Sequence, residues 1–183
     1  MKIQFLGQNG FVLTGKDASV VCDPDEKASV KNADFVTNSG AFAENCEKLE
    51  AKKTLSLPGE FEISNVLVRG FYSRPENVVY KIVIDGVAVV HLGSLEIKPS
   101  TEFFAKLGEN VDVVLVTLND KFGVKEAKEL LETFDPRYMI IGGDQSLFPK
   151  MVESGARIAE ENPIVISQTT LNEEKSEALI LPV

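Results

Sequence analysis

The feature that most constrains the fold is a pair of apolar runs joined by two turn residues. Residues 78–84 and 87–91 are rich in β-branched side chains, and only Asp85 and Gly86 separate them. A two-residue Asp-Gly link favours a type I′ hairpin, because Asp and Gly tolerate the positive φ angles that this turn requires. The sequence therefore predicts a β-hairpin at the centre of the chain.

The hairpin divides a strand-rich half from a half in which strands and helices alternate. The first half predicts strands at residues 2–6, 11–13, 18–22, 34–37, 53–57 and 61–69, a helix at 43–51 and a loop at 70–77. The second half predicts helices at 101–107, with Ser100 as N-cap, at 124–134 and at 146–154, and strands at 111–116, 138–141, 164–167 and 178–181. Two such halves predict an α/β fold, a four-layer αββα sandwich. The length of 183 residues predicts a single domain over residues 1–183.

The charge balance argues against two classes of partner. Lysine and arginine number 19 and aspartate and glutamate 28, so the net charge is 19 − 28 = −9. An acidic chain repels phosphate backbones and anionic lipids, so we expect neither nucleic acid nor a membrane as partner. Two cysteines without paired spacing, no signal peptide and no membrane-spanning apolar run predict a cytoplasmic protein.

Several short segments resemble the metallo-β-lactamase superfamily in their order and spacing. They are residues 1–7, Cys22-Asp23-Pro24, the loop after 34–37, residues 57–63, His91-Leu92-Gly93, residues 112–116 and residues 136–141. The chain is most similar to the small lactonase-like branch of predicted zinc-dependent hydrolases, and the resemblance covers nearly its whole length. It implies the four-layer sandwich and a metal-binding loop after residue 37.

The metal ligands that the resemblance implies are absent from their positions. The family loop reads His-x-His-x-Asp-His and holds one or two Zn²⁺ ions, which generate a hydroxide at neutral pH. Where those ligands would stand, this chain has Asn38, Gly40, Phe42 and Ala43. The loop at 71–76 has no His. The bridging Asp of the family is replaced by Ser94, and the last His falls near Gly142 or Gly143. These degenerate positions predict that zinc is absent and that the protein has no cofactor.

Few residues remain as candidates for chemistry. His91 is the single histidine, and a lone His at a strand end is more often structural than catalytic. Ser94 and Glu60 are further catalytic candidates, whereas Cys22 and Cys46 are expected to be buried hydrophobic residues. Carboxylates at strand ends and in loops offer oxygen ligands to a hard cation such as Mg²⁺ or Ca²⁺. The candidate ligands are Asp23, Glu60 and Asp144, although roles in capping turns and supporting the fold are favoured over a metal site.

Three functions follow from this pattern. The favoured hypothesis is a non-catalytic protein that binds a partner or an unknown small molecule, as a homo-oligomer or as a hetero-oligomer with an active relative. The alternative that the resemblance implies is a hydrolase related to metal-dependent lactonases and phosphoesterases. Its site would contain a metal other than zinc or would be rebuilt from Glu60, His91, Ser94, Asn38 or Asp144. The third is nucleic-acid processing, which the acidic balance disfavours. Clustered polar groups with perturbed pKa values would favour the hydrolase.

Overall fold

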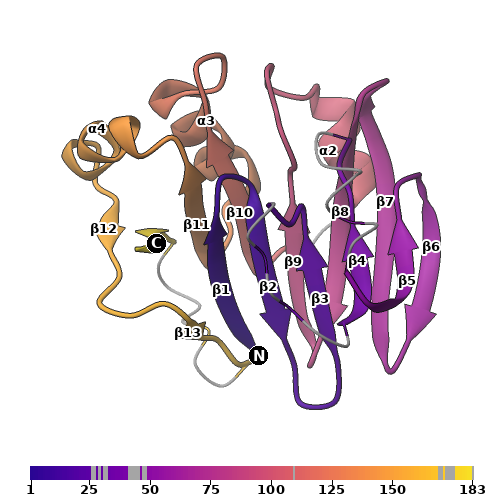
Figure 1. Ribbon diagram of the computed structural model, residues 1–183. Coiled ribbons are helices and arrows are strands. Elements are labelled where there is room, and N and C mark those ends of the chain that lie inside the picture. Colours follow the sequence, from indigo (N-terminus) through magenta and orange to yellow (C-terminus); the bar gives the residue numbers. More distant parts are fainter. Residues whose placement is uncertain are drawn as a thin grey trace.

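The computed structural model describes residues 1–25, 28, 30, 33–40, 46, 49–108, 110–168, 171 and 176–182, and within them two sheets pack face to face (Figure 1). The first sheet has the spatial order β13-β1-β2-β3-β4-β5, with β1 (Lys2–Gly7), β2 (Gly10–Thr14), β3 (Ser19–Cys22), β4 (Ala33–Thr37), β5 (Ala51–Leu55) and β13 (Ile164–Val165). The second has the order β12-β14-β11-β10-β9-β8-β7-β6, with β6 (Gly59–Ile63), β7 (Val66–Arg74), β8 (Asn77–Ile84), β9 (Val87–His91), β10 (Val113–Leu118), β11 (Tyr138–Gly143), β12 (Arg157–Ile158) and β14 (Glu177–Ile180).

The predicted central hairpin is confirmed. Strands β8 and β9 pair antiparallel, with Ile84 opposite Val87. The two residues between them have positive φ angles, 51° at Asp85 and 75° at Gly86. The turn therefore has the sign of φ that a type I′ hairpin needs at both positions.

Helices cover the outer face of the second sheet. They are α2 (Thr101–Leu107), α3 (Val124–Phe134), the short 3₁₀ helix η1 (Gln145–Leu147) and α4 (Phe148–Glu153), and the three α-helices lie on the same side of that sheet (Figure 1). Their buried side chains Phe103, Leu130 and Met151 belong to the same apolar cluster as the outward-facing residues of the sheet. Ser100 caps α2 as predicted, since its hydroxyl accepts a hydrogen bond from Phe103 N at 3.3 Å.

Two further apolar clusters complete the layers. The larger lies between the sheets, where alternate residues of the strands point inward, among them Phe11, Tyr80 and Leu115. The smaller lies on the outer face of the first sheet and includes the helical residue Cys46. Most of the predicted helix at 43–51 lies outside the described residues. The α/β sandwich predicted from the sequence is confirmed.

Some predicted element boundaries are wrong. Residues 61–69 are not one strand, because Ser64 and Asn65 adopt φ angles of 52° and 60° and form a hairpin turn between β6 and β7. The predicted loop at 70–77 is mostly strand, since β7 continues to Arg74 and β8 begins at Asn77. The predicted helix at 146–154 is divided into η1 and α4.

The parallel strands determine where polar residues gather. Strands β9, β10 and β11 are mutually parallel in the second sheet, and β3, β4 and β5 in the first. The segments that follow β4 and β9 meet, as described below, so the ends of these strands form one edge of the sandwich. We call this the carboxyl edge. In the described part of the chain, no helix has the length and apolarity needed to cross a membrane.

Candidate active site

The carboxyl edge is formed where the segment after β4 meets the segment after β9. Gly93 has a φ of 67°, and a Cβ atom at this position would overlap the Ser39 side chain and lie 2.7 Å from Asn77 Oδ1. Only glycine allows this close approach without displacing a neighbour. The contact brings residues 38–39 of the first sheet against residues 91–94 of the second.

Asp23 lies at the base of this junction. It follows β3 with a φ of 41°, a conformation that Asp tolerates better than most residues, and it is 1% exposed. Its carboxylate accepts hydrogen bonds from Ser39 N at 2.7 Å and from the Ser39 hydroxyl. Burial raises the pKa of Asp23 above its usual value, and the charge of His91 and the hydrogen bonds from Ser39 oppose this only in part.

His91 ends strand β9 and points into the space between the sheets. It is 1% exposed, and its ring packs edge-to-face on Phe11 with a centroid distance of 5.9 Å. Neither ring nitrogen has a hydrogen-bond partner of ordinary geometry. Burial lowers the pKa of His91, whereas Asp23 and the nearby backbone of Asn9 act in the opposite direction. The imidazole is therefore neutral at pH 7, and one of its two nitrogens can accept a proton.

The unpaired polar atoms of the described residues concentrate at this edge. The buried side-chain atoms without a hydrogen-bond partner are Thr37 Oγ1, Arg74 Nε and both His91 ring nitrogens. Thr37 ends β4, His91 ends β9, and Arg74 ends β7 and contacts Ser94. Because native proteins pair nearly all such atoms, each exception calls for an explanation, such as an ordered water, strain or a functional role.

Asn77 and Asn9 hold Ser94 in place at the surface of the edge. Asn77 Oδ1 accepts from Ser94 N at 3.0 Å, and Asn77 Nδ2 donates to the Leu92 carbonyl at 3.0 Å. Asn9 Nδ2 donates to the Ser94 hydroxyl, and Arg74 Nη2 donates to the Ser94 carbonyl at 3.3 Å. Ser94 is half-exposed, so its hydroxyl can reach a ligand.

Sequence reasoning missed Asn9, Thr37, Arg74 and Asn77. For Asn77 a signal was present, because it is a polar residue at the start of a strongly apolar run. For the other three residues no local pattern distinguishes them from ordinary turn and strand positions.

The candidate residues proposed from the sequence are only partly brought together. Asn38, His91 and Ser94 lie at the carboxyl edge, with Gly40 beside them. Glu60 instead pairs with Arg69 at 2.5 Å on the surface of β6 and β7. Phe42 and Ala43 lie outside the described residues.

Asp144 and Gly143 have structural roles at the end of β11. The Asp144 carboxylate accepts from Ser146 N at 2.9 Å and caps η1. Gly143 has a φ of 94° and leaves no room for a Cβ atom, which would lie 2.5 Å from Leu118 N. The predicted hard-cation ligands Asp23, Glu60 and Asp144 therefore belong to three separate hydrogen-bond networks.

The resemblance implies a zinc site at this edge, but the residues present there do not fit a zinc ion. Zinc takes three or four His, Cys or carboxylate ligands. In the described ranges no three such side chains gather where they could hold a metal. Both oxygens of Asp23 already accept hydrogen bonds from Ser39. The degenerate ligand positions stay a prediction, and no chemical step is assigned to a metal.

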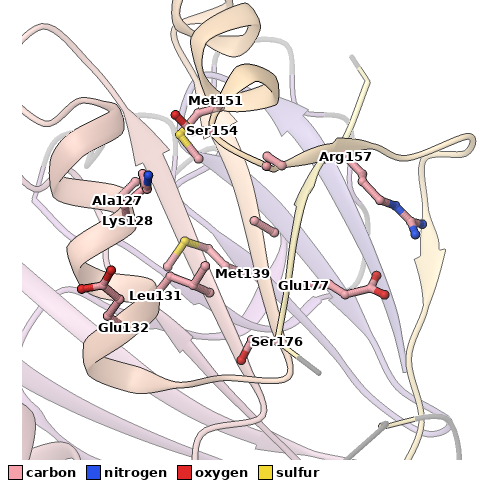
Figure 2. A pocket seen from close by; sticks show the side chains of 13 residues that line it. Ala127, Lys128, Leu131, Glu132, Met139, Met151, Ser154, Arg157, Ser176 and Glu177 are labelled. Carbon is pink, nitrogen blue, oxygen red and sulfur yellow. The ribbon is translucent and has the colours of Figure 1, made fainter. Parts of the chain in front are cut away.

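A pocket lies elsewhere, on the outer face of the second sheet. It has a volume of about 210 Å³ and lies between α3, the end of α4, β12 and β14 (Figure 2). Met139 and Met151 line its apolar interior, and Lys128, Glu132, Arg157 and Glu177 contribute charged side chains. The residues of the carboxyl edge do not contribute to its lining, so it is separate from the candidate site.

Comparisons of the sequence and of the structure with known proteins indicate the same family. Residues 2–141 match the model of the beta-lactamase superfamily domain. A metal-dependent hydrolase of Pyrococcus furiosus is 30% identical over 105 residues, which are 51% of this chain and 47% of that protein. The aligned region thus spans about half the length of the curated relative.

Solved structures show the same fold. A structure of a proposed Zn-dependent hydrolase of the metallo-β-lactamase superfamily from Thermotoga maritima superposes with a TM-score of 0.84 at 22% identity and covers 100% of both chains. A proposed metal-dependent hydrolase from Parabacteroides distasonis gives a TM-score of 0.68 at 16% identity, covering 97% of this chain and 91% of that one.

These names correct one prediction made from the sequence. Relatives described as metal-dependent and Zn-dependent contradict the expectation of a protein without a cofactor. The inference went too far because it equated the loss of ligands at the family positions with the loss of any metal. The expectation is not retained.

Proposed function

Because the chain belongs to the metallo-β-lactamase superfamily, we propose that it is a hydrolase with a rebuilt active site at the carboxyl edge. Its relatives are named hydrolases, which favours this hypothesis over the non-catalytic binding role expected from the sequence. The proposed substrates are lactones or phosphoesters, the bonds that the resemblance first suggested. The single domain, the cytoplasmic location and the oligomeric state stay predictions.

One observation carries the choice of site. Every unpaired buried polar side-chain atom of the described residues belongs to Thr37, Arg74 or His91. Next to them lie two buried titratable groups whose pKa values are shifted toward each other, upward for Asp23 and downward for His91. Such paired shifts and unpaired groups are typical of catalytic sites, where polar groups are kept available for a reacting molecule.

The chemistry that fits these residues is general-base hydrolysis by His91. A neutral imidazole nitrogen removes a proton from water, and the oxygen then bonds to the carbonyl carbon or phosphorus of the substrate. The imidazolium returns the proton to the oxygen of the leaving group, so atoms and charges balance. Asp23 stabilises the imidazolium, because its charge favours protonation of His91. Asn9 and Ser94 donate hydrogen bonds at the surface of the edge.

Access to His91 requires a local displacement. The ring is buried, and the backbone of Asn9 lies beside it. Asn9 belongs to the turn between β1 and β2, and its amide bonds to the half-exposed Ser94 hydroxyl. An outward movement of this turn would admit a water molecule to the ring.

The test compares hydrolysis by the wild-type protein and by His91→Gln. Homoserine lactones, p-nitrophenyl acetate and bis-p-nitrophenyl phosphate serve as substrates, with metal content measured and Zn²⁺, Mn²⁺ or Mg²⁺ supplied in parallel. We expect kcat/KM to fall by about 10²- to 10⁴-fold in His91→Gln, the usual contribution of a general base. In the wild-type protein, activity should fall as the pH decreases and His91 becomes protonated.

Two control variants keep the result interpretable. Glu60→Gln and Asp144→Asn alter carboxylates that lie outside the proposed site, and their activity should remain within about twofold of wild type. Circular dichroism establishes that each variant is folded. Absence of hydrolysis of all three substrates under every metal condition, or full activity in a folded His91→Gln protein, would overturn the proposal.

A further inference from the structure

A cluster of hydrogen-bond donors lies beside Ser94, at the mouth of the proposed site. Arg74 Nη2 donates to the Ser94 carbonyl at 3.3 Å, and Asn9 Nδ2 donates to the Ser94 hydroxyl. Lys121 joins the cluster through Glu96, which it contacts at 3.1 Å. The chain carries a net charge of −9, so two cations beside the proposed site are a local exception.

Among the described residues Glu96 is the carboxylate that pairs with both cations of this cluster, and both its oxygens are engaged. Oε2 lies 2.8 Å from Arg74 Nη1 and Oε1 lies 3.1 Å from Lys121 Nζ. The hydrogen bonds from Arg74 and then Lys121 lower the pKa of Glu96 to about 2. Glu96 is therefore ionised at every pH at which the protein would work, and it binds these cations as a ligand carboxylate would.

Arg74 retains unused binding capacity. Its side chain is 29% exposed, yet its Nε atom is buried and makes no hydrogen bond. A guanidinium presents five N–H groups in a planar fork that matches the oxygens of a carboxylate or phosphate. Each Nη atom carries two N–H groups, and the contacts to Ser94 and Glu96 engage one on each, so the partly exposed end of the guanidinium retains donors for a further acceptor.

We propose that Arg74 and Lys121 form an anion subsite for the substrate and that Glu96 occupies it when no substrate is bound. The subsite rests on the proposed function and narrows the substrate class to esters that carry a second, anionic group. Binding of that group displaces the Glu96 carboxylate and places the scissile bond beside Ser94. A neutral molecule has no group that displaces Glu96, so the subsite neither helps nor hinders its binding.

A second carboxylate in the same protein supplies a matched control. Glu129 on α3 also lies between two cations, Lys98 at 3.3 Å and Lys125 at 4.0 Å. No guanidinium contacts it, and its neighbours include no unpaired buried atom among the described residues. We therefore assign Glu129 to an ordinary surface ion-pair group, whose partners are worth little for ligand binding.

The test measures binding of inorganic phosphate by isothermal titration calorimetry. Glu96→Gln should bind phosphate about fivefold to tenfold more tightly than wild type, as expected when one negative charge is removed a few ångströms from an anion. Glu129→Gln should stay within about twofold of wild type. Adding Lys121→Gln to Glu96→Gln should remove most of the gain. An equal gain in Glu96→Gln and Glu129→Gln, or no gain in either, would overturn the subsite.

A kinetic comparison separates this proposal from the proposed function. Glu96→Gln should lower KM for mono-p-nitrophenyl glutarate, which is anionic, and leave KM for neutral p-nitrophenyl acetate unchanged. If the variants bind phosphate with the expected order of affinities but no substrate is hydrolysed, the anion subsite is supported and only the proposed hydrolase function is contradicted. Hydrolysis with the same phosphate affinity in all variants would sustain the hydrolase and refute the subsite.

Discussion

Two buried carboxylates of the first sheet lie at opposite ends of its neighbouring strands β3 and β4, and their surroundings differ in kind. Asp34, 5% exposed at the start of β4, accepts from Ser19 N at 2.8 Å, from Ser64 Oγ at 2.9 Å and from Lys52 Nζ at 2.6 Å. Burial raises the pKa of Asp34, but these partners outweigh it and lower the pKa overall. Asp23 is more deeply buried, at 1% exposed, and no lysine or arginine pairs with it among the described residues, so burial raises its pKa.

The difference is the one expected between a carboxylate with a structural role and one kept for the proposed site. At Asp34 three hydrogen bonds, one of them from a lysine, stabilise the charge, and the arrangement ties β4 to its neighbours. At Asp23 burial disfavours the charged form of the carboxylate. Beside it lies the neutral His91, whose ring nitrogens have no hydrogen-bond partner of ordinary geometry among the described residues. Proteins retain such unfavourable groups where they are used, so the comparison points to the carboxyl edge as the working part of the molecule.

Removing the Asp23 side chain should give the largest change in stability. Asp23→Ala leaves the Ser39 N–H and hydroxyl unpaired in a buried position, which should lower the free energy of unfolding by about 3 kcal/mol. Asp23→Asn can accept from Ser39 N and donate to its hydroxyl without a buried charge, so it should cost less than about 1 kcal/mol. Urea denaturation at pH 7 measures both. Equal losses for Ala and Asn would show that the charge itself stabilises the edge.

The pH dependence of stability should reveal His91 next. Its folded pKa lies below the unfolded value, so the unfolded state binds the proton first as the pH falls below about 6.5. Wild type should lose up to about 1.4 kcal/mol per pH unit relative to His91→Gln between that pH and the folded pKa. Thermal and urea unfolding from pH 8 to 5 checks the slope. Parallel pH profiles for the two proteins would mean that His91 is not held in its neutral form.

Asp34 should respond to pH in the opposite sense from Asp23. Because its folded pKa is depressed, Asp34 contributes stability above its unfolded pKa and loses it as the pH falls through the folded value. Asp34→Asn should therefore cost about 1 kcal/mol at pH 7, after allowance for the exposed Lys52, and almost nothing at pH 2. For Asp23, acidification should instead stabilise wild type relative to Asp23→Asn. Denaturation at pH 7, 4 and 2 distinguishes the two carboxylates.

The features predicted correctly from the sequence are those that depend on residues adjacent in the chain, such as turns and helix caps. The Asp85-Gly86 hairpin and the Ser100 cap follow local rules, and both are confirmed. The Ser64-Asn65 turn was missed, although these two consecutive polar residues interrupt the alternation across residues 61–69. Local rules also place Asp23 and Asp34 in the same class, as carboxylates at strand ends. Only the fold shows which of them meets Lys52.

The candidate site was less predictable, because what marks it is a set of buried polar side-chain atoms without hydrogen-bond partners among the described residues. No pattern in the sequence tells whether the hydroxyl of Thr37 or the nitrogens of His91 find a hydrogen bond, since their neighbours come from distant strands. The vacated family ligands were visible position by position. Their absence could not establish what the protein binds, and the names of its relatives contradict the inference that it needs no cofactor.

Two buried threonines give the smallest and most direct test. Thr37 and Thr117 are each 1% exposed or less. Thr37 is the last residue of β4 and Thr117 the second-last residue of β10, both at the carboxyl edge. The Thr117 hydroxyl donates to the Gly93 carbonyl at 2.9 Å. The Thr37 hydroxyl lies against the Cys22 thiol, a weak partner, and makes no hydrogen bond of ordinary geometry. The same substitution should therefore have opposite signs at the two positions.

Thr37→Val removes an unpaired hydroxyl at constant shape and should raise the free energy of unfolding by about 0.5 kcal/mol. Thr117→Val removes a paired hydroxyl and should lower it by about 1 kcal/mol. Urea denaturation resolves both values. If the edge is a working site, the stabilised Thr37→Val protein should also lose hydrolytic activity, because a polar group kept unpaired at a cost in stability has another use. If Thr37→Val stabilises the protein and leaves its activity unchanged, Thr37 does not belong to the site, and the site is confined to His91 and its neighbours.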